Sequence, residues 1–115
     1  MVKFLCITVL SFAILGASIA LAQKLTRQQK NAVRSAESYI SLQGFSRAGL
    51  IDQLSSPYGE GYNIDDATVA VDSLSIDWNA QAKRSANQYL EMMGFSCRGL
   101  ISQLSSDAGD KYTKN

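Results

Sequence analysis

Apolar residues in this chain recur at helical spacing, and the same pattern occurs twice. In the first copy Ala32, Ala36, Tyr39 and Ile40 fall on one face of a helix. The second copy repeats that face fifty residues later with Ala82, Ala86, Tyr89, Leu90 and Met93. Aligned without a gap, residues 29–62 and 79–112 are identical at 17 of 34 positions. A repeat of this length indicates a duplicated packing unit.

Each copy predicts a long helix, a tight corner and a short helix. Gly44 and Gly94 follow the last apolar positions of the long helices, and glycine is the usual stop because it adopts the left-handed conformation at little cost. Ser46 then suits the N-cap of the next helix, with Phe45 and Leu50 at the spacing of a hydrophobic staple. The short helices present Leu50, Ile51 and Leu54 in the first copy and Leu100, Ile101 and Leu104 in the second.

The segment between the copies predicts one further helix. Residues 57–61 have turn chemistry. Asn63 and Asp66 can cap a helix that carries Ala67, Ala70, Val71 and Leu74 on one face. Asp77 can cap the long helix of the second copy, and Trp78 in its first turn is expected to pack between the copies.

These elements predict an all-α protein of two tandem helix-turn-helix repeats joined by a short middle helix, with about five helices. We assign residues 25–62 to the first repeat, 63–76 to the connecting helix and 77–112 to the second repeat. A helix pair cannot bury its own apolar face, so we expect the copies to share a core through the middle helix. Residues 107–115 are expected to fray.

The first 22 residues have the layout of a secretory signal peptide. Lys3 precedes an apolar run over residues 4–22, and the run ends in Ala20-Leu21-Ala22 before Gln23. The alternative is an uncleaved membrane anchor, since 19 apolar residues approach the ~20 needed to span a bilayer. Both interpretations place residues 23–115 outside the cytoplasm, secreted or tethered to the outer face of the membrane.

Charge is unevenly distributed along this exported part. No basic residue lies between Arg47 and Lys83, whereas six acids do. Such an asymmetry can attract a basic partner, although caps and solvation also explain acids in this region. We take as the candidate partner-binding residues Asp65, Asp66, Asp72 and Asp77.

The sequence carries few of the residue patterns that catalysis requires. Gly44-Phe45-Ser46-Arg47-Ala48 resembles a nucleophile elbow, but Ala48 replaces the final glycine and the chain has no histidine to serve as a base. Zinc, calcium and phosphate-loop motifs are also missing from the sequence, so we predict a protein that is not an enzyme and has no cofactor. Cys97 is the single cysteine of residues 23–115 and is interpreted as incidental or as the site of a disulfide between chains.

A nucleic-acid-binding module is the alternative that a helix-turn-helix raises. The candidate phosphate contacts are Arg34, Arg47, Arg84 and Arg98. The predicted export of the chain and its balanced charge argue against this alternative.

The repeated block Ala-x-Arg-Ser-Ala-x-x-Tyr-(x4)-Gly-Phe-Ser-(x2)-Gly-Leu-Ile-x-Gln-Leu-Ser-Ser resembles the Ltp-like repeat of host-cell-surface-exposed lipoproteins. Tyr-Gly-Glu-Gly-Tyr and Asp-Trp-Asn-x-Gln-Ala extend the resemblance over residues 25–112. It implies tandem helix-turn-helix repeats and a role in superinfection exclusion. In that role a protein outside the host membrane blocks DNA delivery by an incoming phage by engaging its tape-measure protein.

One position departs from that family. Its members carry a lipobox cysteine at the first mature position, where this chain has Gln23, and Cys6 lies inside the apolar run. The protein would then be released or held by the uncleaved segment. The leading hypothesis is an extracytoplasmic, non-enzymatic protein-binding module acting in phage exclusion, and a secreted cell-wall-associated structural protein is a further alternative.

Overall fold

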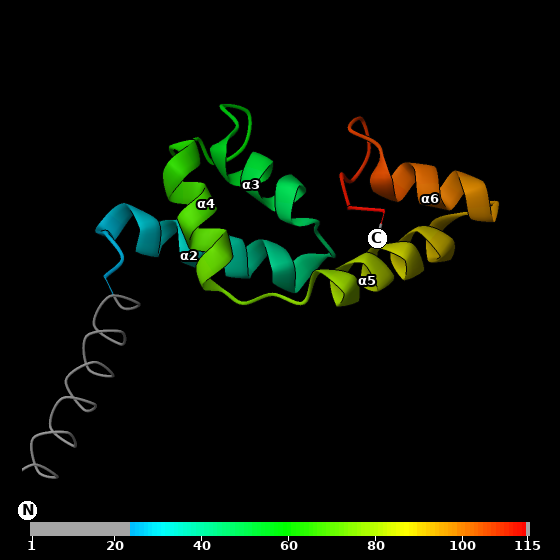
Figure 1. The fold of residues 1–115 in the computed structure, drawn as a ribbon, viewed down its shortest axis with the longest axis horizontal. Coiled ribbons are helices and arrows are strands. Elements are labelled where there is room, and N and C mark those ends of the chain that lie inside the picture. Colours follow the sequence, from blue (N-terminus) through cyan, green and yellow to red (C-terminus); the bar gives the residue numbers. More distant parts are fainter. Residues whose placement is uncertain (1–23, 115) are drawn as a thin grey trace, which may run out of the picture.

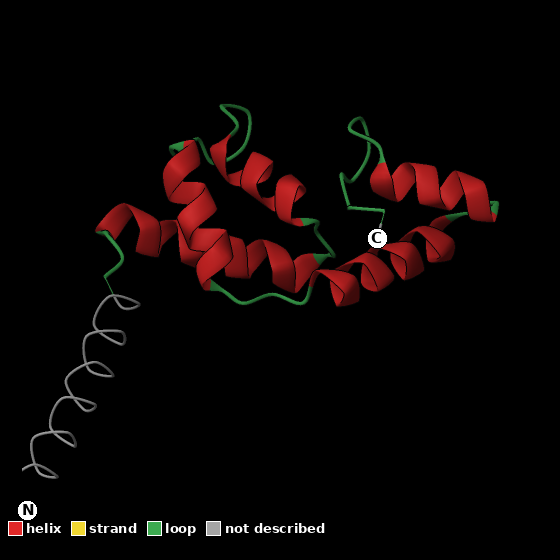
Figure 2. Ribbon diagram, viewed as in Figure 1, coloured by secondary structure: helices red, strands yellow, loops and turns green. Residues whose placement is uncertain are grey.

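The computed structural model describes residues 24–114, and over that range the chain forms five helices and no strand (Figures 1 and 2). They are α2 (Arg27–Leu42), α3 (Arg47–Ser55), α4 (Ile64–Ser73), α5 (Trp78–Met92) and α6 (Cys97–Ser105). The all-α prediction with about five helices is therefore confirmed. The predicted signal segment, residues 1–22, lies outside the described residues. None of the five helices has both the length and the apolar character needed to cross a membrane.

Local capping signals set where the helices begin. The Gln29 N–H donates to Thr26 Oγ1 at 3.1 Å and the Thr26 N–H donates to Gln29 Oε1 at 3.0 Å, which completes the predicted capping box at α2. Ser46 caps α3 by accepting from the Gly49 N–H at 2.9 Å. The remaining N-caps are Asn63 for α4, Asp77 for α5 and Ser96 for α6.

The ends of the long helices differ from the sequence-based prediction. Gln43 and Met93, the C-cap residues of α2 and α5, have extended backbones with φ of −156° and −161°. Among the described glycines only Gly61 has a positive φ. The prediction that Gly44 and Gly94 stop the helices in the left-handed conformation is therefore wrong, because the chain leaves each helix directly in an extended conformation.

The hydrophobic core lies in the first half of the molecule, where α4 covers the pair formed by α2 and α3 (Figure 1). α4 contributes Ala67 and Val71, both fully buried. The other core residues come from α2 and α3: Ala36, Leu50, Ile51 and Leu54. Trp78, the first residue of α5, is partly buried against this cluster, consistent with its predicted packing between the copies.

Apart from Trp78 at the start of α5, the second helix pair does not share that core. α5 and α6 pack against each other, while α4 packs against α2 and α3, and α6 has no buried residue. The expectation of one core shared through the middle helix is therefore wrong. The physical reason is that α4 has a single apolar face, and α2 and α3 already cover it.

Polar contacts join the two halves instead. Arg84 on α5 donates to the backbone carbonyls of Ile40 and Ser41, at the C-terminal end of α2. A cation is favourable there because the last carbonyls of a helix lack intrahelical donors. The Gly44 N–H donates to Gln88 Oε1 on α5 at 3.0 Å, which fixes the corner of the first repeat against α5.

The segment after α6 is held in place rather than frayed. The Tyr112 N–H donates to the Leu104 carbonyl at 2.8 Å, and the Tyr112 and Ser85 hydroxyls share a hydrogen bond of 2.7 Å. Tyr112 is only 7% exposed. The prediction that residues 107–115 fray is thus wrong up to Tyr112, because this tyrosine seals the second repeat.

Candidate partner-binding surface

The four predicted aspartates lie on α4 and at the start of α5, but they do not form one cluster. Asp65 and Asp72 are seven residues apart on α4, with Val69 between them, and therefore share one face of that helix. This face is opposite to the buried Ala67, Ala70 and Val71. We call the group of Asp65, Val69 and Asp72 the outer face of α4; all three residues are exposed, Val69 by 40%.

Asp72 forms an ion pair with the first residue of α3. Its two carboxylate oxygens accept from Arg47 Nε at 2.7 Å and from Arg47 Nη2 at 2.9 Å. This bidentate hydrogen bonding lowers the pKa of Asp72 and raises the pKa of Arg47. Asp72 therefore stays ionised well into the acidic range, and its charge is partly compensated within the repeat.

Asp66 and Asp77 have local structural roles. Asp66 lies on the flank of α4, half-buried, and accepts from Gln29 Nε2 on α2 at 3.1 Å. Asp77 is the N-cap of α5 and accepts from the Ala80 N–H at 3.1 Å. Of the predicted set, Asp65 and Asp72 are thus the two that the structure brings together on an exposed helix face.

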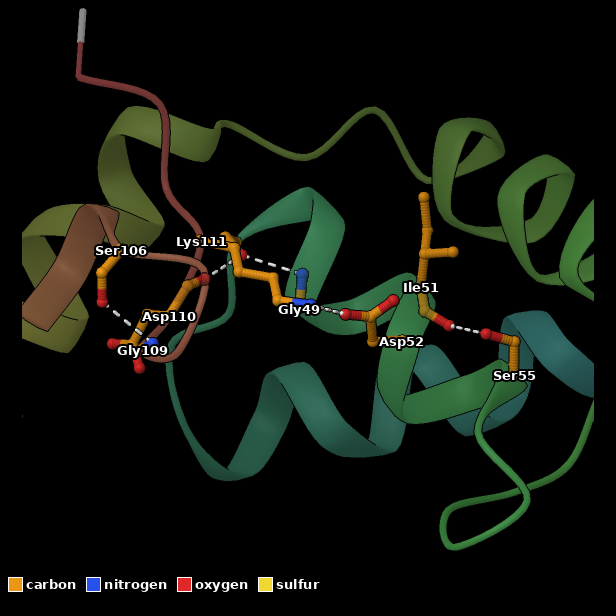
Figure 3. A network of polar contacts seen from close by, with 9 residues as sticks. Gly49, Ile51, Asp52, Ser55, Ser106, Gly109, Asp110 and Lys111 are labelled. Carbon is orange, nitrogen blue, oxygen red and sulfur yellow. Dashed lines mark hydrogen bonds and ion pairs between the residues drawn. The ribbon is translucent and has the colours of Figure 1, made fainter.

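Sequence reasoning missed a second acidic contact, at the junction of the repeats. Lys111 Nζ donates to Asp52 on α3, and the Ser46 hydroxyl donates to the Asp110 carbonyl. Figure 3 shows the segment from Ser106 to Lys111 lying against α3 through these contacts. The Asp52 carboxylate raises the pKa of Lys111. Because the two members of the ion pair are 59 residues apart, no local signal could have identified it.

A surface cavity of about 370 Å³ lies at this junction. Residues of both repeats line it, among them Phe45, Gln53, Tyr58, Gly109, Asp110 and Lys111. Its charged lining residues are Asp52, Asp110 and Lys111. Asp52 and Lys111 are paired with each other, and the Asp110 carboxylate accepts from the Tyr89 hydroxyl, so all three charged groups are already engaged within the protein.

Both repeats contain the same tyrosine–carboxylate contact. The Tyr39 hydroxyl donates to Glu60 Oε1 at 2.7 Å, and the Tyr89 hydroxyl donates to Asp110 Oδ1 at 2.8 Å. The hydrogen bond to Glu60 raises the pKa of Tyr39, and burial together with the Asp110 contact raises the pKa of Tyr89. Each contact ties the long helix of its repeat to the turn after the short helix, so these carboxylates stabilise the fold.

The arginines proposed for phosphate contact are partly occupied. Arg47 is paired with Asp72, and Arg84 donates to the carbonyls that end α2. Arg34 and Arg98, the other two, lie in different repeats. Two of the four candidate arginines are therefore already engaged in contacts within the protein.

Comparison with known proteins identifies the family. The family model described as host cell surface-exposed lipoprotein matches residues 27–74 and 77–115. The fold is similar to that of Ltp, a superinfection exclusion protein from the Streptococcus thermophilus temperate phage TP-J34. That match has a TM-score of 0.70 and 33% sequence identity, and covers 79% of this chain and 89% of that chain. No curated protein matches the sequence.

These findings agree with the resemblance seen in the repeated block and with an extracytoplasmic, cell-surface location. The two matched segments together include all five described helices. The chain belongs to the family of host cell surface-exposed lipoproteins.

Proposed function

We propose that this protein acts in superinfection exclusion, as an extracytoplasmic, non-enzymatic module that binds a protein of an incoming phage and prevents DNA delivery. The observation that carries the proposal is the structural match to a superinfection exclusion protein over most of both chains. Membership of a family of surface-exposed lipoproteins supports the location that such a role requires. The partner class that the family resemblance implies is a phage tape-measure protein.

The proposed contact surface is the outer face of α4. Asp65 and Asp72 present two exposed carboxylates on either side of Val69. A basic partner segment would contact Asp65 directly. At Asp72 it would displace Arg47 from its ion pair, and the lowered pKa of Asp72 keeps that carboxylate ionised. Exposed charge pairs are screened within about 8–10 Å at ordinary ionic strength, so binding through this face should weaken as salt rises.

Retention at the cell surface would depend on residues 1–22. Gln23 stands where the lipid-bearing cysteine of the family is expected, so we assign membrane attachment to the uncleaved apolar segment. Cleavage before Gln23 would release the protein and remove it from the place where phage DNA enters.

A phage challenge tests the proposal. Phage-sensitive bacteria expressing the full chain are compared with cells carrying an empty vector, and adsorption and DNA entry are measured separately for a panel of phages. The proposal predicts unchanged adsorption and reduced DNA entry for at least one phage. Equal DNA entry for every phage, with the protein present at the cell surface, would contradict it and favour the structural role in the cell wall.

A matched pair of variants then tests the surface. Asp65→Asn combined with Asp72→Asn removes both carboxylates of the outer face of α4, and Glu91→Gln removes an exposed carboxylate from α5 instead. Exclusion should weaken in the double variant and persist in the control. Equal exclusion by all three proteins at equal surface abundance would place the contact surface elsewhere.

A further inference from the structure

The two helix pairs are built alike, but only the first has a third helix across it. Figure 1 shows α4 lying over α2 and α3, whereas no described helix lies over α5 and α6. Under α4, Leu50 and Leu54 are fully buried and Ile51 is 8% exposed. The equivalent Ile101 is 53% exposed.

The apolar residues of the second pair are half-buried or exposed at positions equivalent to those packed beneath α4, and we treat them as one strip. Repeat symmetry places in it the counterparts of the residues that meet α4 in the first repeat. Leu90, the counterpart of Ile40, is 51% exposed. We call this strip the second-repeat groove, and it consists of Ala86, Leu90, Leu100, Ile101 and Leu104.

The same contacts hold both helix pairs, so the residues of the second-repeat groove are carried on a helix pair built like the covered one. The Tyr39 and Phe45 rings meet edge to face with centroids 5.9 Å apart, and Tyr89 and Phe95 do so at 5.7 Å. Gln53 Nε2 donates to the Tyr39 hydroxyl at 3.3 Å, as Gln103 does to Tyr89 at 3.2 Å. An incoming helix would therefore meet a preformed site, which lowers the entropic cost of binding.

The first repeat shows what chemistry such a site accepts. α4 inserts small side chains at positions i, i+3 and i+4, namely Ala67, Ala70 and Val71, and all three are fully buried. Small residues allow the helix axis to approach the pair closely. A helix with bulky residues at these positions would not fit a groove of this form.

Net charge favours an acidic helix at both pairs, although Arg47, which pairs with Asp72 of α4, corresponds to Cys97 in the second pair. α4 carries three aspartates and no basic residue. The charged residues of the pair it covers, α2 and α3, are Arg27, Lys30, Arg34, Glu37, Arg47 and Asp52. Those of the uncovered pair, α5 and α6, are Lys83, Arg84, Glu91 and Arg98. Both pairs thus have a net charge of +2, and only the first is matched by an acidic helix.

We propose that the second-repeat groove binds an acidic amphipathic helix of another protein, with alanine- or valine-sized residues at i, i+3 and i+4, in the manner in which α4 covers the first repeat. This site is separate from the outer face of α4 and of opposite charge preference. It therefore goes beyond the proposed exclusion contact, and its test does not involve phage.

The test uses α4 itself as the probe. A fluorescein-labelled peptide of residues 63–76 is titrated with the full chain, and binding is followed by fluorescence polarisation. Because a helix this short is marginal in water, positions 65 and 69 on its solvent-facing side are crosslinked to hold the helix. A second peptide carries Ala67→Asp and Val71→Asp on the face that would be buried.

The result expected is saturable binding of the first peptide and none of the second. Ile101→Asp and, separately, Leu90→Asp should each weaken binding roughly tenfold or more, since each places a charge against the buried face. Leu42→Asp, at a residue 75% exposed in the first repeat, should leave binding unchanged. Both groove residues are half-exposed, so these variants should fold, which circular dichroism verifies.

Two results would overturn the proposal. One is the absence of saturable binding at millimolar concentrations of the full chain. The other is binding that Ile101→Asp and Leu90→Asp both leave intact, because the peptide would then be displacing α4 from the first repeat. Neither result bears on whether the protein excludes phage.

Discussion

Gly44, at the corner between α2 and α3, lies directly against Ser85 on α5. A Cβ atom built at residue 44 would be 2.4 Å from Ser85 Oγ and 2.8 Å from the Gln81 carbonyl oxygen. The equivalent Gly94 has no atom within 4 Å of such a position. The same glycine therefore permits close helix packing in one repeat and faces open space in the other.

This contrast predicts opposite effects for one substitution. Gly44→Ala should destabilise the protein by about 1–3 kcal/mol, because the added methyl group forces α5 away from the corner. Gly94→Ala should be neutral or stabilising by up to ~1 kcal/mol, since alanine restricts the unfolded chain at a position without a positive φ. Urea unfolding of the two variants measures both effects, and equal destabilisation would mean that the corner does not pack against α5.

A second matched pair of substitutions tests how much the burial of a leucine beneath α4 contributes to stability. Leu54→Ala should cost about 2–5 kcal/mol, because Leu54 is fully buried beneath α4 and a cavity would remain. Leu104→Ala should cost clearly less, since Leu104 is only half-buried in the uncovered groove. Thermal or urea unfolding measures the loss of unfolding free energy in each variant. Comparable losses in the two variants would indicate that the second-repeat groove is covered in solution.

Much of the fold could be predicted from the sequence because its signals are local. The capping box of Thr26 and Gln29, and the caps Asn63 and Asp77, act within three residues and are where the pattern placed them. The periodic apolar positions likewise predicted the buried face of α4. These features depend on neighbours along the chain, which is the information that a sequence displays directly.

The features that escaped prediction depend on contacts between distant residues. No local pattern indicated a partner for Asp72, but Arg47, 25 positions away, forms an ion pair with it. The sequence predicts that residues 107–115 fray, but the Tyr112 hydroxyl shares a hydrogen bond with the Ser85 hydroxyl on α5. The role of Gly44 likewise depends on α5, which approaches the corner only in the folded protein. The partner-binding role of the four aspartates stays a prediction, and the contacts that engage Asp66 and Asp72 within the protein exist only in the folded chain.

The Arg47–Asp72 pair should make a small, pH-dependent contribution to stability. The pKa of Asp72 is lower in the folded than in the unfolded protein, so the contribution is present above the unfolded pKa and is lost as pH falls through the folded one. Both side chains are about half exposed, by 47% and 50%, which limits the contribution to less than ~1 kcal/mol. Arg47→Met should therefore be slightly less stable than wild type at pH 6, with a gap that closes below about pH 4. A gap that persists at pH 2 would show that Arg47 acts through packing.

The Ser85–Tyr112 hydrogen bond should matter most at neutral pH and lose its effect in alkali. Tyr112→Phe leaves the Ser85 hydroxyl, only 3% exposed, without this partner and should cost about 1–3 kcal/mol. Burial raises the pKa of Tyr112, so above about pH 10 the unfolded chain releases this proton first and the wild type loses stability that Tyr112→Phe retains. The difference in unfolding free energy between the two proteins should therefore narrow as pH rises through 10. A constant difference from pH 7 to pH 11 would mean that Tyr112 ionises as readily folded as unfolded, and that it does not seal the second repeat.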